Sequence, residues 1–253
     1  MPAPAWLVAT PIAHRGLHDE THPENSLSAI EAALQRGFPV EIDVQVSADG
    51  RAVVFHDWNL LRLTGFDARV KMTSSAEIAK LRIEGGSERI PLLEDVLDLI
   101  GGRQGVIIEI KNRKRPCALE QEVSRILRDY PGDAVIHSFN PFSLGWFRSN
   151  HPSLCRGQIS CSFDTDDMAG WKKIILANYG MNWMSRPQFI SHHWKQLPAI
   201  VPWLLRRVLG MPLLAWTVRS VGEQDAALRY SDNFFFETYV PSGKHGPQFA
   251  SAL

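Results

Sequence analysis

Five short clusters of reactive side chains stand at the ends of apolar runs in this 253-residue chain. They are His14-Arg15-Gly16, Glu41-Ile42-Asp43, His56-Asp57, Glu109-Ile110-Lys111 and Trp216-Thr217. Glu41 and Asp43 lie two residues apart, as do Glu109 and Lys111, so each pair points to one face of an extended strand. If the three carboxylates converge, they raise one another's pKa values unless a cation neutralises them. One divalent cation with oxygen ligands, Mg²⁺ or Ca²⁺, is the simplest solution.

The same clusters supply two imidazoles, His14 and His56, and two cations, Arg15 and Lys111. A metal ion with Arg and Lys suits a phosphoryl group, whose oxygens gain negative charge in the transition state. Two histidines suit a general base and a general acid, because imidazole titrates near neutral pH. Cleavage of a phosphodiester needs both: one group accepts the proton of the nucleophile and the other protonates the leaving alcohol. Any single cluster could be a solvated strand face or a surface ion pair, but five such coincidences at strand ends are improbable.

Strands that alternate with amphipathic helices predict an α/β fold with a parallel sheet. The expected strands are Leu7–His14, Val40–Val46, Ala52–His56, Val106–Lys111, Ala134–Ser138, Gly157–Cys161, Gln188–Ser191, Leu213–Val218 and Asn233–Glu237. Asp49-Gly50 is a two-residue hairpin signal, so the third strand should run antiparallel to the second. The other eight strands can then close a (β/α)8 TIM barrel, whose catalytic groups lie at the carboxyl ends of the strands. A two-residue turn would place Asp43 opposite His56.

Composition excludes several other classes of protein. The 27 Lys and Arg balance 27 Asp and Glu, so no overall positive field draws the chain to nucleic acid. Three cysteines without a C-x-x-C pair do not support a disulfide framework. We find neither a signal peptide nor a transmembrane segment and expect a cytoplasmic protein. For the aromatic and basic stretch Trp203–Trp216 we favour a barrel helix packed on the sheet, with contact to a membrane surface as the alternative.

These residues, in this order, resemble the glycerophosphodiester phosphodiesterase family. The similarity runs through AHRG (13–16), PENS (23–26), VEIDVQVSADGRAVVFHD (40–57), LLRLTG (60–65), IPLLEDVL (90–97), IEIK (108–111), SF (138–139) and WTV (216–218). Several ungapped motifs in sequence are a specific signal. The resemblance implies a TIM barrel with a hairpin-plus-helix insertion after the second strand, at about 44–90, and one domain over residues 1–253.

The resemblance also implies residue roles. His14 and His56 would be the catalytic acid–base pair, with His14 as base and His56 as acid in our assignment. Glu41, Asp43 and Glu109 would bind the metal, while Arg15 and Lys111 would hold the phosphate and Trp216 would line the pocket. Glu24 and Asn25 would support the rim of the site. The substrate would be a small-molecule glycerophosphodiester, hydrolysed to an alcohol and glycerol 3-phosphate through attack by water or by a neighbouring glycerol hydroxyl.

The C-terminal third departs from the family pattern at two positions. Arg219 replaces a common Asn after WTV, and Glu237-Thr238 stands where Thr-Asp usually precedes a proline. Arg219 could add positive charge at the mouth or point into solvent. Two alternatives to hydrolysis remain: a phospholipase D-like lyase that stops at a cyclic phosphate, and a non-catalytic glycerophosphodiester-binding module. The sequence predicts neither the headgroup nor the oligomeric state.

Overall fold

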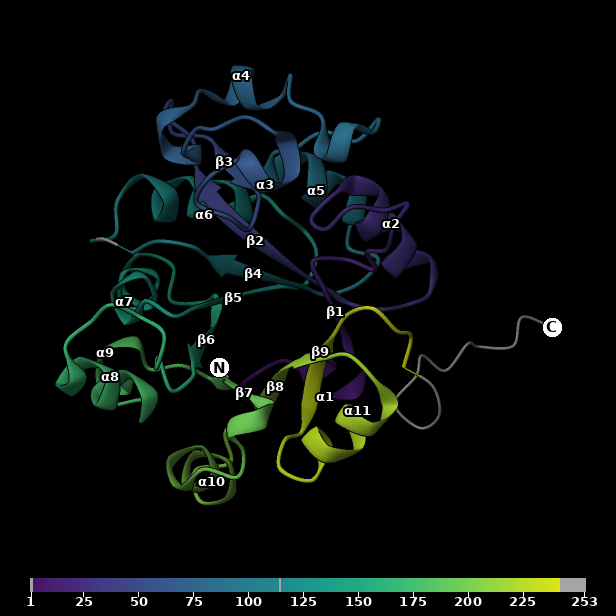
Figure 1. Ribbon diagram of the computed structural model, residues 1–253. Helices are drawn as coiled ribbons and strands as arrows, with labels where there is room; N and C mark the ends of the chain where they lie inside the picture. Colours follow the sequence, from purple (N-terminus) through teal and green to yellow (C-terminus); the bar gives the residue numbers. More distant parts are fainter. Residues whose placement is uncertain (1, 114, 242–253) are drawn as a thin grey trace.

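The computed structural model describes residues 2–113 and 115–241, in which nine strands form a single sheet (Figure 1). The strands are β1 Ile12–His14, β2 Val40–Val46, β3 Ala52–Val54, β4 Val106–Ile110, β5 Ala134–Ser138, β6 Cys155–Ser160, β7 Phe189–His193, β8 Leu213–Val218 and β9 Asn233–Phe236. Their order is β1-β9-β8-β7-β6-β5-β4-β2-β3, and β1 also pairs with β2. Eight parallel strands therefore close a barrel, as predicted, and β3 pairs antiparallel with the end of β2, beyond the residues of β2 that pair with β1.

Helices and short helical turns surround the barrel (Figure 1). They are α1 Trp6–Ala9, α2 Leu27–Gln35, α3 Leu61–Thr64, η1 Val70–Met72, α4 Ser75–Ile78, η2 Ile83–Gly85, α5 Leu93–Ile100, α6 Ala118–Arg128, α7 Pro141–Asn150, α8 Gly170–Ala177, α9 Asn182–Ser185, η3 Trp194–Gln196, α10 Ile200–Arg207 and α11 Val221–Leu228. Across residues 2–113 and 115–241, every helix is too short or too polar to serve as a bilayer span.

Alternation along the strands divides the side chains between two layers. Outward residues such as Val40, Ile42, Ile108 and Phe236 pack beneath the helices in the main hydrophobic core. Inward residues fill one end of the barrel with a second apolar cluster: Leu7, Ile12, Ile107, Val135, Cys155, Phe189, Leu214 and Phe235. Toward the carboxyl ends of β1, β2, β4 and β5 the inward residues are polar, which places the reactive residues in the barrel mouth above an apolar floor.

The first predicted strand is wrong over its first half. Leu7 belongs to α1, and β1 begins only at Ile12, after Pro11. The apolar run Leu7–His14 is consistent with either structure, but α1 lies across the end of the barrel. Leu7 is fully buried there, and the side-chain amide of Asn233 donates to the carbonyls of Leu7 and Thr10.

The predicted register of the β2–β3 hairpin is also wrong by one residue. Val44 pairs with Val54, so the Phe55 amide, rather than His56, bonds to the Asp43 carbonyl. The turn contains three residues, 48–50, because the backbone of Ser47 bonds directly to that of Arg51 and Gly50 adopts a positive φ of 84°. Ser75 of α4 donates from both its amide and its hydroxyl to the Asp49 carboxylate, and Ser47 donates to it as well, so the three-residue turn is held in place.

The segment between β2 and α5 forms the predicted insertion, although it is more fragmented than a hairpin and one helix. It contains β3, α3, η1, α4 and η2. Its own apolar cluster consists of Val53, Phe55, Leu60, Leu63, Val70, Ile78, Ile83 and Ile90. The insertion thereby holds the end of β3, and His56 just beyond it, against the barrel. Residues 1, 114 and 242–253 of the single domain predicted for the chain lie outside the described residues.

A buried histidine in the barrel wall predicts a pH-dependent stability. Burial, together with the neighbouring His193, lowers the pKa of His192 to about 4, and the side chain contacts the Tyr179 hydroxyl at 3.0 Å. In the unfolded chain His192 takes up a proton below about pH 6.5, whereas in the folded protein it does so only near pH 4. The free energy of unfolding therefore decreases as the pH falls through this range. We expect the free energy of unfolding to drop by about 3 kcal/mol from this residue between pH 7 and pH 4.

Urea unfolding at both pH values would measure this loss, with His192→Gln as the comparison. The Gln variant should lose about 3 kcal/mol less than the wild type over the same interval, because it has no imidazole to protonate. Equal losses in the two proteins would contradict a neutral His192.

Candidate active site in the barrel mouth

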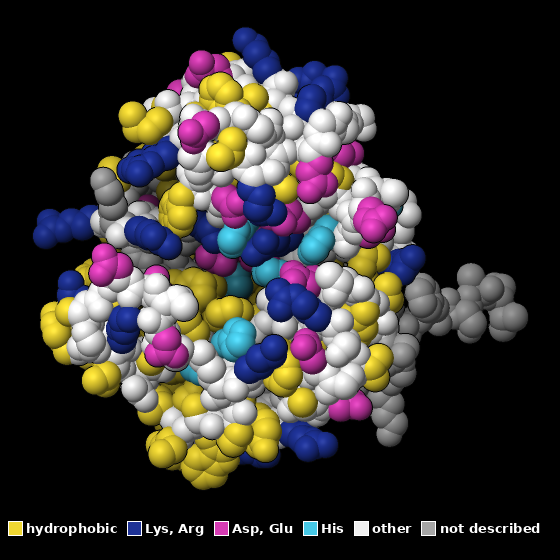
Figure 2. Space-filling model, viewed as in Figure 1, with side chains coloured by type: hydrophobic (Ala, Val, Ile, Leu, Met, Phe, Trp, Pro, Cys, Tyr) yellow, Lys and Arg dark blue, Asp and Glu magenta, His cyan; other side chains and the backbone are white. Residues whose placement is uncertain are grey.

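The inward polar residues of neighbouring strands meet in the barrel mouth. Parallel pairing places Asp43 of β2 beside Glu109 of β4, and Glu109 beside His137 of β5. On the other side, His14 of β1 is beside Glu41 of β2. Figure 2 shows acidic, basic and histidine side chains gathered in the central hollow of this face. The convergence follows from strand parity and from the closure of the sheet.

Glu41, Glu109 and His137 form a group that could hold a metal ion. One ligand atom from each lies within 4.8 Å of the others, and His137 Nε2 is 3.5 Å from Glu41 Oε1. Glu41 and His137 are buried. Among the described residues, neither Glu41 Oε1 nor either ring nitrogen of His137 has a hydrogen-bond partner. Unsatisfied buried polar atoms are costly, and a cation would satisfy them, so this donor set fits a divalent metal.

Asp43 lies among cations. Lys111 Nζ is 3.2 Å from Asp43 Oδ1, and Arg15 Nε is 3.1 Å from Oδ2. The side-chain amide of Asn25 also donates to Oδ2 at 3.0 Å. Burial favours the neutral acid, but Lys111 and Arg15 outweigh it and hold the pKa of Asp43 well below its usual range. The carboxylate is therefore ionised, and it orients both cations in the mouth.

Arg15 and Lys111 provide two positive charges at the centre of the site. Lys111 Nζ also lies 3.4 Å from Glu109 Oε1, and Arg15 donates to Glu24 at 3.0 Å. Burial opposes the charge of Lys111, but Glu109 and Asp43 raise its pKa above the ordinary value. Both cations are thus permanently charged and held in place, as recognition of a phosphate requires.

His14 is oriented by a carboxylate on its far side. His14 Nδ1 is 2.8 Å from Glu237 Oε2, while Nε2 faces the site, 3.8 Å from Glu41 Oε2. Arg219 bonds to the other oxygen of Glu237 at 2.6 Å, so this arginine is tied to the site. Burial opposes ionisation of Glu237, but hydrogen bonds to His14 and His18 and the charge of Arg219 lower its pKa. An ionised partner at Nδ1 leaves Nε2 of a neutral His14 free to accept a proton.

His56 has a similar arrangement, with its neighbour in sequence as the partner. His56 Nδ1 is 2.7 Å from Asp57 Oδ1, and Arg62 binds the same carboxylate. Burial raises the pKa of Asp57, but bonds from Arg62 and His56 lower it further than burial raises it. Gln45 of β2 fixes this segment by donating to three successive backbone carbonyls, at residues 55–57. The insertion therefore presents a second imidazole held by a carboxylate.

Trp216 of β8 belongs to an aromatic wall of the mouth. Its ring centroid lies 5.7 Å from that of Phe139 and 5.1 Å from that of His193, in edge-to-face geometry. Phe163 extends the wall at 6.0 Å from Phe139. Such a wall can pack against the carbon skeleton of a substrate.

Sequence reasoning missed His137 and noted Glu237 only as a departure from the family motif. The signal for His137 was its inward parity in the expected strand Ala134–Ser138, two residues after apolar Val135. Its contact with Glu41 depends on barrel closure and strand register, which the sequence does not specify. Glu24 and Asn25 hold Arg15 and Asp43, consistent with their expected supporting place.

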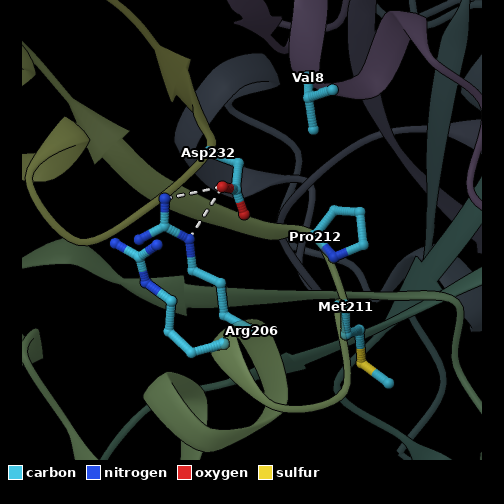
Figure 3. Close-up of a pocket in the computed structure, with 7 residues that line it drawn as sticks. Val8, Arg206, Met211, Pro212 and Asp232 are labelled. Atoms are coloured by element: carbon cyan, nitrogen blue, oxygen red, sulfur yellow. Dashed lines mark hydrogen bonds and ion pairs between the residues drawn. The ribbon is translucent and has the colours of Figure 1, made fainter.

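A second hollow, of about 500 Å³, lies at the opposite end of the barrel and contains none of the predicted site residues. It is lined by Val8, Arg206, Arg207, Gly210, Met211, Pro212 and Asp232. Figure 3 shows Arg206 bound to Asp232, an ion pair of 2.7 Å.

Comparison with known proteins points to one family. A model of the glycerophosphoryl diester phosphodiesterase family matches residues 14–233. A glycerophosphodiester phosphodiesterase of Caldanaerobacter subterraneus is 36% identical over 58% of this chain and 65% of its own length. One from Bacillus altitudinis is 32% identical over 56% of this chain and 62% of its own. The matched region thus spans less than two thirds of these relatives.

Solved structures of low sequence identity share the fold. A phosphodiesterase from Oleispira antarctica, solved with the product sn-glycerol-3-phosphate, gives a TM-score of 0.71 at 24% identity, over 94% of this chain and 93% of that one. A glycerophosphodiester phosphodiesterase from Thermotoga maritima gives 0.70 at 23% identity, over 90% and 94%. The barrel fold is therefore common to this chain and these proteins.

Proposed function

The chain belongs to the glycerophosphoryl diester phosphodiesterase family, as its motifs predicted, and we propose that it hydrolyses a glycerophosphodiester to an alcohol and glycerol 3-phosphate. The observation that carries this proposal is the pair of imidazoles, each oriented through Nδ1 by a carboxylate, on a mouth that also holds Arg15 and Lys111. The product bound to the Oleispira antarctica phosphodiesterase is the one that this reaction would release.

Arg15 and Lys111 bind and orient the phosphate in this mechanism. Their charges balance the negative charge that grows on the phosphoryl oxygens in the transition state, and Asp43 keeps both side chains in place. The aromatic wall of Trp216 and Phe139 packs against the carbon skeleton of the substrate.

His14 acts as the base and His56 as the acid. A hydroxyl group, from water or from the glycerol next to the phosphate, attacks phosphorus and gives its proton to His14 Nε2. The bond from phosphorus to the leaving oxygen breaks, and that oxygen takes a proton from His56. If the glycerol hydroxyl attacks first, the product is a cyclic phosphate, which water opens while the histidines exchange roles. Glu237 and Asp57 stabilise whichever imidazole is protonated.

Glu41, Asp43 and Glu109 are the proposed metal ligands, and His137 is a further candidate because of its place beside Glu41. A bound Mg²⁺ or Ca²⁺ would polarise the phosphoryl group and lower the pKa of a coordinated hydroxyl. The buried carboxylate oxygen of Glu41, which lacks a hydrogen-bond partner among the described residues, supports a cation at this place.

Hydrolysis of glycerophosphocholine, glycerophosphoethanolamine and glycerophosphoinositol, followed by phosphorus NMR, tests the function. We expect glycerol 3-phosphate as the final product, activity lost in excess EDTA, and recovery with Mg²⁺ or Ca²⁺. A cyclic phosphate that persists would favour the lyase, and binding without turnover would favour the binding module. Activity that is unchanged in EDTA would overturn the role of the metal.

A further inference from the structure

Charge is distributed unevenly along a chain whose net charge is zero. Residues 168–222 contain no Asp or Glu. They carry seven cations: Lys172, Lys173, Arg186, Lys195, Arg206, Arg207 and Arg219. This segment runs from the β6–α8 loop through α10 to the start of α11, so one sector of the barrel is strongly basic while the rest is acidic by the same amount.

The outer face of α10 in that sector is apolar. Ile200, Trp203, Leu204 and Val208 lie three or four residues apart and form one stripe along the helix, which is apolar except for Arg207. The stripe is solvent-exposed: 79% of Ile200, 52% of Trp203, 42% of Leu204 and 66% of Val208 is accessible. Leu209, just beyond the helix, is equally exposed. A surface helix normally exposes its polar face to solvent. This exposed apolar stripe therefore indicates a surface that binds a partner.

The inner face of α10 already attaches the helix to the barrel. Pro202 is buried, and Val201 and Leu205 pack against the cluster of Tyr179, Ile190 and Leu213. The expected packing of this region on the sheet is therefore correct for one face only. The exposed stripe is not needed to hold α10, so its apolar character has no explanation within the fold.

The preceding helices, α8 and α9, also expose large apolar side chains on the outside of the barrel. Trp171 and Ile174 of α8 and Trp183 of α9 are each more than 60% exposed. The Lys172 ammonium lies 5.5 Å from the centre of the Trp171 ring. Figure 1 places these helices with α10 on the outer wall, and Figure 2 shows apolar side chains there. We call α8, α9 and α10 together the basic apolar wall.

The carboxyl end of α10 carries two arginines, one of which is accessible to an anion. Arg206 is held by Asp232 and by the backbone carbonyls of Tyr230 and Ser231. Arg207 is exposed and lines the 500 Å³ hollow together with Arg206 and Asp232. Within residues 2–113 and 115–241 it has no ion-pair partner, so its guanidinium is available to a phosphate.

We propose that the basic apolar wall docks on the surface of an anionic phospholipid bilayer. Exposed tryptophans, aliphatic side chains and Lys or Arg on one face, with no acidic residue among them, are the composition of a helix that lies in the membrane interface. Aromatic rings and aliphatic chains insert between the headgroups, and the cations bind lipid phosphates. The proposal is independent of the enzymatic function, because docking is measured without turnover.

Co-sedimentation with vesicles of phosphatidylcholine alone, or of phosphatidylcholine with phosphatidylglycerol at 7:3, tests the proposal. The full chain should bind the anionic vesicles at least tenfold more tightly than the neutral ones, and salt should weaken that binding. The double substitution Ile200→Ser and Trp203→Ser should reduce binding at least tenfold. Arg207→Gln should reduce it on the order of fivefold.

Matched controls are Met72→Ser, which removes a side chain that is 72% exposed, and Lys71→Gln, both on η1 in the insertion. Both should bind vesicles like the wild type. All substituted positions are solvent-exposed, and circular dichroism would verify folding of each variant. Failure to bind anionic vesicles, or equal losses in the controls, would overturn the proposal. A dimer in sedimentation velocity that Trp203→Ser dissociates, without vesicle binding, would assign the wall to a second copy of the chain instead.

Discussion

The His14→Ala variant is expected to hydrolyse glycerophosphocholine with a kcat/KM lowered by about 10²- to 10⁴-fold. His14 Nε2 faces the mouth, while Nδ1 is fixed 2.8 Å from Glu237. Its loss removes the proposed proton acceptor without removing Arg15, Lys111 or the carboxylates. Substrate affinity should therefore change much less than kcat, which steady-state kinetics would resolve.

A comparison of leaving groups separates the two histidines. A p-nitrophenyl phosphodiester releases a stable phenolate that needs little protonation, whereas choline leaves as a strongly basic alkoxide unless an acid assists. If His56 is the acid, His56→Ala should lower the hydrolysis of glycerophosphocholine by about 10²- to 10⁴-fold and that of the p-nitrophenyl ester far less. His14→Ala should affect both substrates.

His151→Ala is the matched control, because this histidine lies at the end of α7 and contacts Ser124 outside the barrel mouth. It should behave like the wild type with both substrates. The opposite pattern, in which His14→Ala spares the p-nitrophenyl ester, would reverse the acid and base assignments. Full activity of both His14 and His56 variants would refute the two-histidine mechanism.

The convergence of Glu41 and Glu109 could be predicted from sequence because it depends only on parity. Each is an inward residue near the carboxyl end of a parallel strand, and barrel closure brings all such residues to one mouth. Lys111 could be placed there by the same argument. Arg15 could not, because it directly follows inward His14 and lies beyond the end of β1, where its backbone has a positive φ of 59°. Much of the proposed site could therefore be expected without coordinates.

Relations that depend on register could not be predicted in this way. Asp43 was expected opposite His56, but the turn contains three residues instead of two, which shifts the register by one. A three-residue loop that ends in a glycine of positive φ fits Asp49-Gly50 as well as a two-residue turn does, so the sequence did not decide between the two registers. His137 has the same inward parity as Glu109, but its contact with Glu41 joins two strands that are not adjacent in the sheet and was not expected.

The pattern of α10 shows the limit of hydrophobic periodicity. A helix packed on the sheet was expected for Trp203–Trp216, but only the start of that stretch lies in α10, and Leu213–Trp216 belong to β8. Only the accessible area of each side chain distinguishes Val201 and Leu205, which pack inward, from Trp203 and Val208, which do not. The expected packed helix is thus present over Ile200–Arg207, but only one of its faces contacts the fold.

The carboxylate variants Glu41→Gln and Glu109→Gln should weaken the binding of Mg²⁺ or Ca²⁺ by more than about 100-fold, since loss of a ligand's supporting partner alone costs about 10- to 100-fold. Calorimetric titration measures this without turnover. The wild type should also gain about 2.7 kcal/mol in unfolding free energy at a metal concentration 100 times Kd. Both variants should gain little at that concentration, and Asp98→Asn, on the exposed face of α5, should match the wild type.

Two further variants, Asp43→Asn and His137→Gln, show whether Asp43 or His137 is the remaining metal ligand. A metal ion coordinated by Asp43 must compete with Lys111 and Arg15 for the carboxylate oxygens. In His137, by contrast, neither ring nitrogen has a hydrogen-bond partner among the described residues. Carboxylates favour Mg²⁺ and Ca²⁺, and imidazole favours Zn²⁺. If Asp43 is a ligand as predicted, Asp43→Asn weakens Mg²⁺ binding strongly and His137→Gln weakens chiefly Zn²⁺ binding. Mg²⁺ affinity that survives Asp43→Asn but is lost in His137→Gln would transfer the ligand role to His137.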